Sequence, residues 1–564
     1  MRREPNGAGC GAGTPGDRRL AALLAGATLA IAGCTGAGTA TGTAPGAADR
    51  PAATTSSGAT FAPKRPPAPS YGPAAADMAC PRVGAIEFLA REVEPAAKAS
   101  GKPAPRPDPR LCALAETFLG WNEKASPPES VVVFASGYVG LPAPAARVIV
   151  ATLETEDPRQ LAQPLVDPTQ KFAANAGAPS FGLATQRVRK DTTKVVLVLQ
   201  DTRVEISAVP RQLPVDGQAA LSGRLLGGYT HPKILACQPG GKLESSSGRD
   251  GDAFEAELRC GGKPGAMPVE IRGEKDGTPA SLARFRIFCG IDAPKAVSVA
   301  PPPASGALPG GDVTQAAKTM LDLVNADRSS VGLSPLAWDD GVADVARAAS
   351  ESYRADASGG TSFDLVARLK QAGIGSLVVL QNPLAAPSIE QAHALVGSSP
   401  VNRCNELNGE VTHAGVGVAP AKDPSGGTLL YITELFVREL PEVNADDVRG
   451  KLRAAIARRR ADARTGPVTS DPTLEETAQR YAAALAAANG KLPKEQESHI
   501  VAPLYKRFRS VNIIGGTKAD PLELAEEPGV TGAGKVFGVG AAQGSNEVLG
   551  KNAVYVVILV GTRK

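Results

Sequence analysis

The sequence is poor in aromatic and histidine side chains. Only 4% of its 564 residues are Phe, Trp or Tyr, so it lacks the aromatic residues interleaved with basic ones on which nucleic-acid bases stack. The formal net charge of +4 is close to balanced and gives no sign of attraction to a polyanion. We therefore exclude nucleic acid as a partner. Histidine-based acid–base and metal chemistry is limited to four positions, which are His231, His393, His413 and His499.

The chain also lacks a hydrophobic run of membrane-spanning length. The apolar run over residues 20–32 is shorter than the roughly 20 residues that a span needs. Arginines precede it and small residues follow it, which indicates a signal peptide over residues 1–33. Its end, Ile31-Ala32-Gly33-Cys34, matches a lipobox, in which cleavage before the cysteine accompanies acylation of the thiol. We expect lipid-bearing Cys34 to hold the chain to a membrane of the cell envelope, facing the periplasm or the exterior. Cleavage without a lipid is the alternative.

Two further segments are poor in large apolar side chains. Residues 34–77 consist mostly of Ala, Gly, Pro and Thr and cannot bury a core, so we predict a flexible stalk. Residues 292–312 contain three consecutive prolines followed by a Gly/Ala-rich stretch, which predicts a linker.

The chain has eight cysteines but no C-x-x-C pair and no Cys/His cluster with zinc spacing. Cys10 leaves with the signal peptide. In an oxidising compartment the six that remain after Cys34 favour disulfides over metal ligation. Proximity suggests Cys80 with Cys112, and Cys260 could pair with Cys289. Six cysteines allow about 15 connectivities, so the pairing of Cys237, Cys260, Cys289 and Cys404 stays open.

Part of the sequence recurs with a constant offset of 132 residues. The matched pairs are Val324 and Ile456, Arg328 and Arg460, Pro335 and Pro467, Asp339 and Asp471, Val342 and Leu474, and Ala346 and Ala478. A weaker copy starts at Asp108-Pro109, where a chance match stays open. Each copy closes with a glycine-rich strand pair. We predict three units, at 78–207, 313–440 and 441–564, each an α/β/α sandwich of the α+β class.

Residues 208–291 have a different pattern. Apolar and charged side chains alternate over residues 254–260 and again over residues 284–289, which is typical of strands with one buried face. Short Gly/Asp/Ser turns separate the runs. We predict a small β-sandwich of immunoglobulin-like type between the first and second units.

The unit at 313–440 resembles the CAP superfamily of cysteine-rich secretory, antigen 5 and pathogenesis-related proteins, also called SCP domains. The resemblance lies in N-x-x-R at Asn325 to Arg328, in G-L-S-P-L-A-W-D at residues 332–339, in S-P-V-N-R-C-N at residues 399–405, and in G-V-G-V at residues 415–418. It covers about 120 residues. The units on either side would be divergent copies.

The resemblance implies a cavity with two His and two Glu that can hold zinc. This sequence departs from that tetrad: Gln381 precedes Asn382 where the family has Glu-Asn, Asn402 replaces a histidine, and only Glu390 is a candidate for the remaining carboxylate. Because an amide is a poor zinc ligand, we expect no metal and no cofactor in this cavity. We expect His413, just before the G-V-G-V strand, to be a surface residue.

Signatures of catalysis are otherwise absent, since G-x-S-x-G, H-E-x-x-H and the phosphate-binding loop do not occur. We interpret Ser398 and Ser399 as turn residues, and the basic run over residues 451–464 as a solvated helix face. The leading hypothesis is a non-catalytic envelope lipoprotein whose CAP-like modules bind a lipid, an envelope polymer or a protein. The alternatives are an envelope hydrolase with an atypical site and a purely structural spacer.

Overall fold

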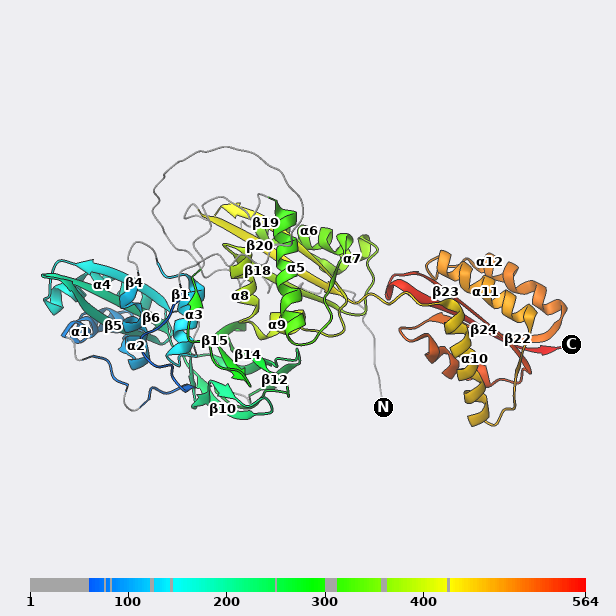
Figure 1. Cartoon of the computed structure of the whole chain (residues 1–564), viewed down its shortest axis with the longest axis horizontal. Helices are drawn as coiled ribbons and strands as arrows, with labels where there is room; N and C mark the ends of the chain where they lie inside the picture. The colour runs from blue at the N-terminus through cyan, green and yellow to red at the C-terminus, as the bar shows by residue number, and fades with distance from the viewer. Residues whose placement is uncertain are drawn as a thin grey trace, which may run out of the picture.

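The computed structural model describes residues 60–75, 78–81, 84–121, 126–142, 146–248, 251–299, 312–356, 363–422 and 427–564. Cys34, the signal peptide and the first part of the stalk lie outside the described residues. The fold is α+β, which confirms the predicted class. Figure 1 shows the N-terminal unit at one end, the β-sandwich beside the middle unit at the centre, and the last unit, orange to red, at the other end.

Three four-stranded sheets have the same strand order. In each sheet a two-residue strand runs parallel to its neighbour and the other pairings are antiparallel. The orders are β3 (Arg106–Pro107), β5 (Pro179–Arg189), β6 (Thr192–Asp201), β4 (Arg147–Leu153); β17 (Ala337–Trp338), β19 (His413–Lys422), β20 (Thr428–Val437), β18 (Val379–Ala386); and β21 (Thr469–Ser470), β23 (Val536–Asn546), β24 (Gly550–Arg563), β22 (Phe508–Thr517). This shared order is what a repeat requires.

Each of these sheets separates two hydrophobic cores, because helices pack on both of its faces. The N-terminal unit has α1 (Gly84–Ala99), α2 (Pro109–Thr117), the short 3-10 helix η2 (Phe118–Gly120), α3 (Glu129–Tyr138) and α4 (Pro158–Ala173). The middle unit has α5 (Val313–Ser330), α6 (Asp340–Asp356), α7 (Leu365–Gln371), α8 (Ile389–Val396) and α9 (Pro400–Glu406). The last unit has α10 (Ala445–Asp462), α11 (Pro472–Ala487), α12 (Lys494–Val501) and the 3-10 helices η4 (Ala502–Lys506), η5 (Pro521–Glu526) and η6 (Pro528–Thr531).

The recurring aspartate joins a helix to the sheet in all three units. The backbone N–H of Asp108, Asp339 and Asp471 donates to Phe181, Ala414 and Phe537 of the neighbouring strand at 2.9, 3.0 and 2.9 Å. The same carboxylates accept a backbone N–H in the first turn of α2, α6 and α11, as capping residues do.

Glycine on the adjacent strand is required by close packing. A Cβ on Gly182, Gly415 or Gly538 would lie 2.0 to 2.2 Å from the backbone of α2, α6 or α11. No side chain fits at that separation. The glycine-rich strands of the sequence pattern therefore mark where a helix backbone lies directly on the sheet.

The recurring arginine is buried and bonded to backbone carbonyls. Arg328 is 2% exposed and Arg460 is 3% exposed. The Nε of Arg328 donates to Ser334 O (2.9 Å) and the Nε of Arg460 donates to Gly466 O (3.1 Å). The Nη1 atoms reach two carbonyls each, at residues 406 and 408 in one unit and at 530 and 532 in the other. The prediction that Arg460 belongs to a solvated basic face was therefore wrong, because its guanidinium holds a loop inside the unit.

The β-sandwich consists of two sheets around one core, which contains Phe254, Leu258 and Phe285. One sheet is β13 (Ala253–Arg259), β10 (Gln218–Leu225), β7 (Val204–Ile206), and the other is β12 (Leu243–Ser247), β11 (Thr230–Cys237), β14 (Gly265–Lys275), β15 (Thr278–Cys289), β9 (Gln212–Leu213). The alternating pattern thus corresponds to paired strands with one buried face. The immunoglobulin-like type stays a prediction.

The expected stalk and linker differ from the structure at their folded ends. Strand β1 (Thr60–Phe61) pairs with β16 (Val297–Ser298), and β2 (Ser70–Tyr71) pairs with β8 (Val209–Pro210). The ring of Phe61 stacks on Phe118 at 5.4 Å, and Tyr71 is 2% exposed in the sandwich core. Residues 60–75 and 297–298 therefore belong to the folded part. The average composition of residues 34–77 did not indicate this, because Phe61 and Tyr71 are single aromatic anchors in a segment with few other large apolar side chains.

Three disulfides lie within the part of the chain that the structure describes, and they join Cys80 to Cys112, Cys260 to Cys289 and Cys237 to Cys404. The first lies within the N-terminal unit and the second within the sandwich. The third connects β11 of the sandwich to α9 of the middle unit, a sequence separation of 167 residues. It therefore fixes two separate folded units to each other covalently.

Candidate functional site

The middle unit has a buried polar network between the edge strand β18 and its neighbour β20. Asn382 of β18 and Glu434 of β20 face each other across the strand pair, and both are fully buried. The Nδ2 of Asn382 donates to Glu434 Oε2 at 2.8 Å and to the backbone O of Asn402 at 3.0 Å. The Nδ2 of Asn405 donates to Asn382 Oδ1 at 2.8 Å. These bonds tie two strands to helix α9.

A charged cluster continues the network on the other side of α9. Arg403 Nη1 donates to Glu406 Oε2 at 3.0 Å and also contacts Asp327 of α5. The Nε2 of His393 on α8 lies 2.9 Å from Asp327 Oδ2. The arginine therefore connects the carboxylates of two helices and offsets part of their charge.

Burial raises the pKa of two carboxyl groups in this network. The pKa of Glu406 rises to about 8, because burial and then the nearby Glu434 disfavour its ionised form more than Arg403 favours it. Burial likewise raises the pKa of Glu434 to about 7, although the hydrogen bond from Asn382 opposes the shift. One oxygen of each carboxyl has no hydrogen-bond partner among the described residues. Negative charge on either carboxyl group is therefore disfavoured in the core.

The structure brings some of the expected site residues together in this network and leaves others outside it. Gln381 Nε2 donates to Tyr353 Oη at 2.9 Å at one edge of the network. Asn382 is at its centre, and Asn402 contributes its backbone carbonyl. Glu390 is exposed on α8 and, among the described contacts, is not part of this network. His413 is partly exposed and lies 3.3 Å from Glu439.

The charged residues of the site were not predicted from the sequence. Glu434 lies in a strand that the pattern had identified, and Asp327 precedes the recurring Arg328. Arg403 and Glu406 lie on the same helix as Asn402. A signal was available for Glu406, since a residue four positions beyond Asn402 lies on the same face of a helix.

Zinc does not fit this arrangement. Asp327, His393 and Glu406 place ligand atoms within 4.8 Å of one another, which is close enough for a shared cation. However, the guanidinium of Arg403 already lies among them and bonds to both carboxylates. A divalent ion there would meet a fixed positive charge, and the position of a family histidine is occupied by Asn402.

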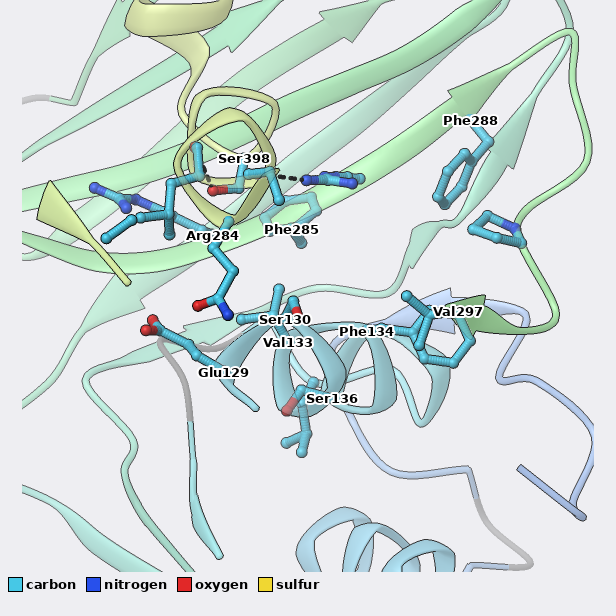
Figure 2. A pocket seen from close by; sticks show the side chains of 18 of the residues that line it. Glu129, Ser130, Val133, Phe134, Ser136, Arg284, Phe285, Phe288, Val297 and Ser398 are labelled. Carbon is cyan, nitrogen blue, oxygen red and sulfur yellow. Dashed lines mark hydrogen bonds between the residues drawn. The ribbon is translucent and has the colours of Figure 1, made fainter. Parts of the chain in front are cut away.

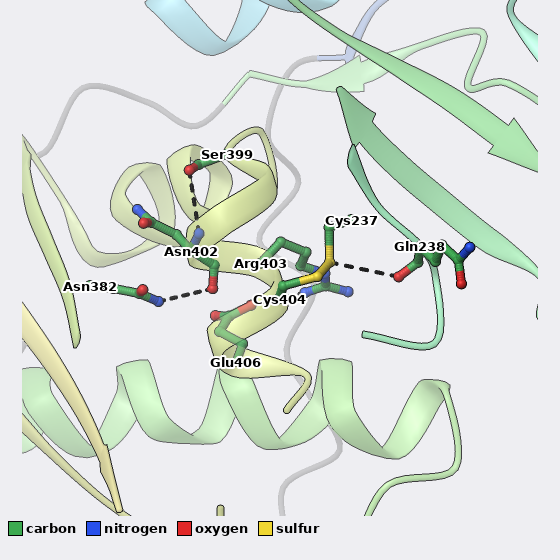
Figure 3. The surroundings of a disulfide bond; sticks show 8 residues. All are labelled: Cys237, Gln238, Asn382, Ser399, Asn402, Arg403, Cys404 and Glu406. Atoms are coloured by element: carbon green, nitrogen blue, oxygen red, sulfur yellow. Dashed lines mark hydrogen bonds and ion pairs between the residues drawn. A yellow bond between two sulfur atoms is a disulfide. The ribbon is translucent and has the colours of Figure 1, made fainter. Parts of the chain in front are cut away.

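The disulfide to the sandwich lies beside the network. Figure 3 shows Asn382 and Asn402 on one side of α9 and the Cys237–Cys404 bond on the other. The turn of the sandwich approaches so closely that a Cβ on Gly241 would lie 2.2 Å from Leu407 O. The sandwich therefore immobilises the helix that supplies Arg403 and Glu406.

The family model of the cysteine-rich secretory protein family, CAP, matches residues 321–436. Residues 321–436 are a CAP domain. The match includes every residue of the polar network, from Asp327 to Glu434. The resemblance expected from the sequence motifs is therefore confirmed for the middle unit. No curated protein matches the chain at a significant level.

Three solved structures show partial similarity to the chain. An extracellular SCP-domain protein of Bacillus anthracis is 20% identical with a TM-score of 0.20, and covers 31% of this chain and 64% of its own length. A cysteine-rich secretory protein of Staphylococcus aureus is 13% identical with a TM-score of 0.19, and covers 43% and 81%. An outer surface protein of Borrelia burgdorferi is 13% identical with a TM-score of 0.19, and covers 22% and 95%. The chain thus spans less than two thirds of the first of these proteins.

Within the part of the chain that the structure describes, no helix has the length and apolar character that a transmembrane span requires.

Proposed function

We propose that the chain is a non-catalytic binding protein of the cell envelope, tethered through lipid on Cys34, with the CAP domain as one of its folded modules. The observation that carries the proposal is the position of Arg403 between Asp327 and Glu406. A guanidinium bound in this way supports a structural role for the acids, because they are already paired with a fixed cation.

Two other observations support a location outside the cytoplasm. The described residues form three disulfides, and disulfides persist mainly in oxidising compartments. The sequence of residues 1–34 has the pattern of a signal peptide that ends at a lipobox. The segment that begins at residue 60 pairs with folded strands. About 25 residues of low-complexity chain between Cys34 and residue 60 would then separate the anchor from the fold.

An envelope hydrolase is the second candidate, and the raised pKa values of Glu406 and Glu434 favour it. Such values suit general acid–base catalysis near neutral pH. Both side chains are nevertheless 0% exposed, and a general acid must reach the proton acceptor of its substrate. The buried position therefore favours the binding function.

The test compares the full chain with the Cys34→Ser chain in cells. We expect an alkyne-labelled fatty acid to label the full chain and to hold it in the membrane fraction, and we expect both to be lost on substitution. The purified chain should cleave neither isolated peptidoglycan nor denatured protein. Cleavage that is lost in Glu406→Gln would overturn the non-catalytic function, and an unlabelled full chain would overturn the tether.

A further inference from the structure

A cavity lies where three folded units meet, apart from the polar network of the CAP domain. Its volume is about 260 Å³, and its walls come from α3 of the N-terminal unit, β15 of the sandwich and α8 of the CAP domain. Figure 2 shows Val133 of α3 on one side of the cavity and Phe285 of β15 on the other. Each unit thus supplies one wall, so the cavity exists only in the assembled chain.

The cavity wall is mainly apolar. Val133 and Phe134 come from α3, Phe285 and Phe288 from β15, and Leu395 from α8. Val133 is 37% exposed, although most large aliphatic side chains of this unit are buried. An apolar wall in a concave site gains free energy when a ligand displaces its water.

Two arginines bring unmatched positive charge to this apolar space. Arg211 is 4% exposed and packs against the rings of Tyr71 and Tyr138, while its Nη1 donates to Ala68 O at 3.1 Å. The Nη2 of Arg286 donates to Ala394 O at 3.3 Å. The buried Nε of each arginine has no hydrogen-bond partner among the described residues.

The carboxylates near the cavity are either paired with other side chains or exposed to solvent. Arg284 also lines the cavity, and it pairs at 2.9 Å with Glu270, a carboxylate that it shares with Arg272. Asp327 acts on Arg286 electrostatically, yet its carboxylate is bound by Arg403 and His393. Glu129 lines the cavity and is exposed to solvent. In the described structure no carboxylate lies within ion-pair distance of Arg211 or Arg286.

Buried N–H groups on a cation are costly when they lack an acceptor. A carboxylate is the acceptor that matches a guanidinium best, because the bond is charge-assisted. The apolar wall requires that the rest of the ligand be hydrophobic. The two requirements together describe an amphiphile with one anionic head and a short apolar body.

We propose that this cavity binds a single-chain fatty carboxylate, with the carboxylate held by the positive charge of Arg211 and Arg286 and the chain lying against Val133, Phe134 and Phe285. The inference rests on the proposed binding function and gives it a ligand class. The site belongs to the junction of three units, so a CAP domain alone would not contain it.

The experiment measures binding of dodecanoate and of uncharged dodecanol to the full chain carrying Cys34→Ser, by calorimetry without detergent. We expect one dodecanoate per chain, bound at least about tenfold more tightly than dodecanol. Arg286→Gln should weaken dodecanoate by about tenfold or more and leave dodecanol unchanged. Val133→Trp should weaken both ligands because it fills the cavity. The exposed Arg259→Gln in the same sandwich is the matched control and should change neither.

Equal affinity for the two ligands, no binding, or binding that neither Arg286→Gln nor Val133→Trp affects would overturn the inference. A peptide with an apolar C-terminal residue that binds the cavity more tightly than dodecanoate would also overturn the ligand class. Intact disulfides by mass and an unchanged unfolding midpoint show that each variant is folded. If dodecanoate does not bind and no substrate is cleaved, this inference alone is contradicted. Cleavage of peptidoglycan or denatured protein would instead contradict the proposed function.

Discussion

The CAP domain differs from the two units with the same strand order at a pair of facing residues that is polar and fully buried in the CAP domain. In the CAP domain the pair consists of Asn382 on the edge strand β18 and Glu434 on the central strand β20. The equivalent pairs are Ile149 with Leu197 in the N-terminal unit and Ile514 with Ile558 in the last. The equivalence follows from the register, since Glu434, Leu197 and Ile558 each lie opposite the residue that follows the close-packed glycine.

Some of these residues are required by the shared fold, and others are specific to the CAP domain. The outer units show that the same sheet forms with an aliphatic pair at this place. The polar network is therefore not a requirement of the fold, and it places two carboxyls where burial disfavours their charge. The recurring Asp, Gly and Arg positions are, in contrast, the parts of the pattern that join helices, strands and loops.

The largest effect should come from removing a feature that the CAP domain shares with the last unit. Arg328→Ala and Arg460→Ala each leave several buried carbonyls without a donor, and we expect a loss of about 3–5 kcal/mol in the free energy of unfolding. Urea unfolding followed by circular dichroism measures it. Arg347→Ala, at an exposed pair with Asp344, is the control and should change stability by less than about 0.5 kcal/mol. If both variants were as stable as the control, the shared role of the arginines would be wrong.

Next in size is the effect of making the CAP domain like its neighbours. Asn382→Ile alone removes the donor to Glu434 and should cost about 1–3 kcal/mol. Asn382→Ile with Glu434→Ile removes both polar groups, and should recover most of that loss at pH 8. A double-mutant cycle measured by urea unfolding gives the coupling. Additive losses would show that the two residues do not act as a pair.

A pH effect should be specific to the CAP domain. Unfolded carboxyls ionise near the ordinary value of 4.5, whereas the pKa of Glu406 and of Glu434 is raised to about 8 and about 7 in the fold. The folded state holds more protons between these limits, so stability should fall as pH rises from 4.5 to 8. Unfolding measured across this window should show the fall, and Glu406→Gln with Glu434→Gln should flatten it. An equal slope in wild type and variant would contradict the assignment.

The smallest effect concerns the contact between the last unit and the CAP domain. Lys551 of β24 pairs with Asp339 and with Glu439, the latter at 3.0 Å. Because the lysine is more than half exposed, Lys551→Ala should cost at most about 1 kcal/mol. Calorimetric unfolding at low salt measures the loss, and it should disappear at high salt. A large loss that persists in salt would mean that this contact is structural.

Much of the architecture follows from local patterns in the sequence. The constant offset identified Asp339 with Asp471 and Arg328 with Arg460, because these positions cap helices and hold loops in each unit. Alternation over residues 254–260 indicated the sandwich strands. The stalk boundary could not be obtained in the same way, since Phe61 and Tyr71 are single anchors in segments with little other apolar side chain.

The site could be predicted only in part. Motif comparison identified Asn382 and Asn402, but not that Arg403 would neutralise Asp327 from a helix 76 residues away. It also suggested Glu390, which is exposed, because position in a motif does not fix the direction of a side chain on a short helix. The cavity at the junction of three units depends on how those units dock, a property that no local pattern encodes.

The most direct test of the central claim is the zinc content of the purified full chain after dialysis against zinc, measured by mass spectrometry of the metal. We expect no stoichiometric zinc in the wild-type chain or in Asn402→His, because Arg403 lies between Asp327 and Glu406 in both. One zinc ion per chain that is lost in Glu406→Gln, or zinc binding restored by Asn402→His alone, would contradict it.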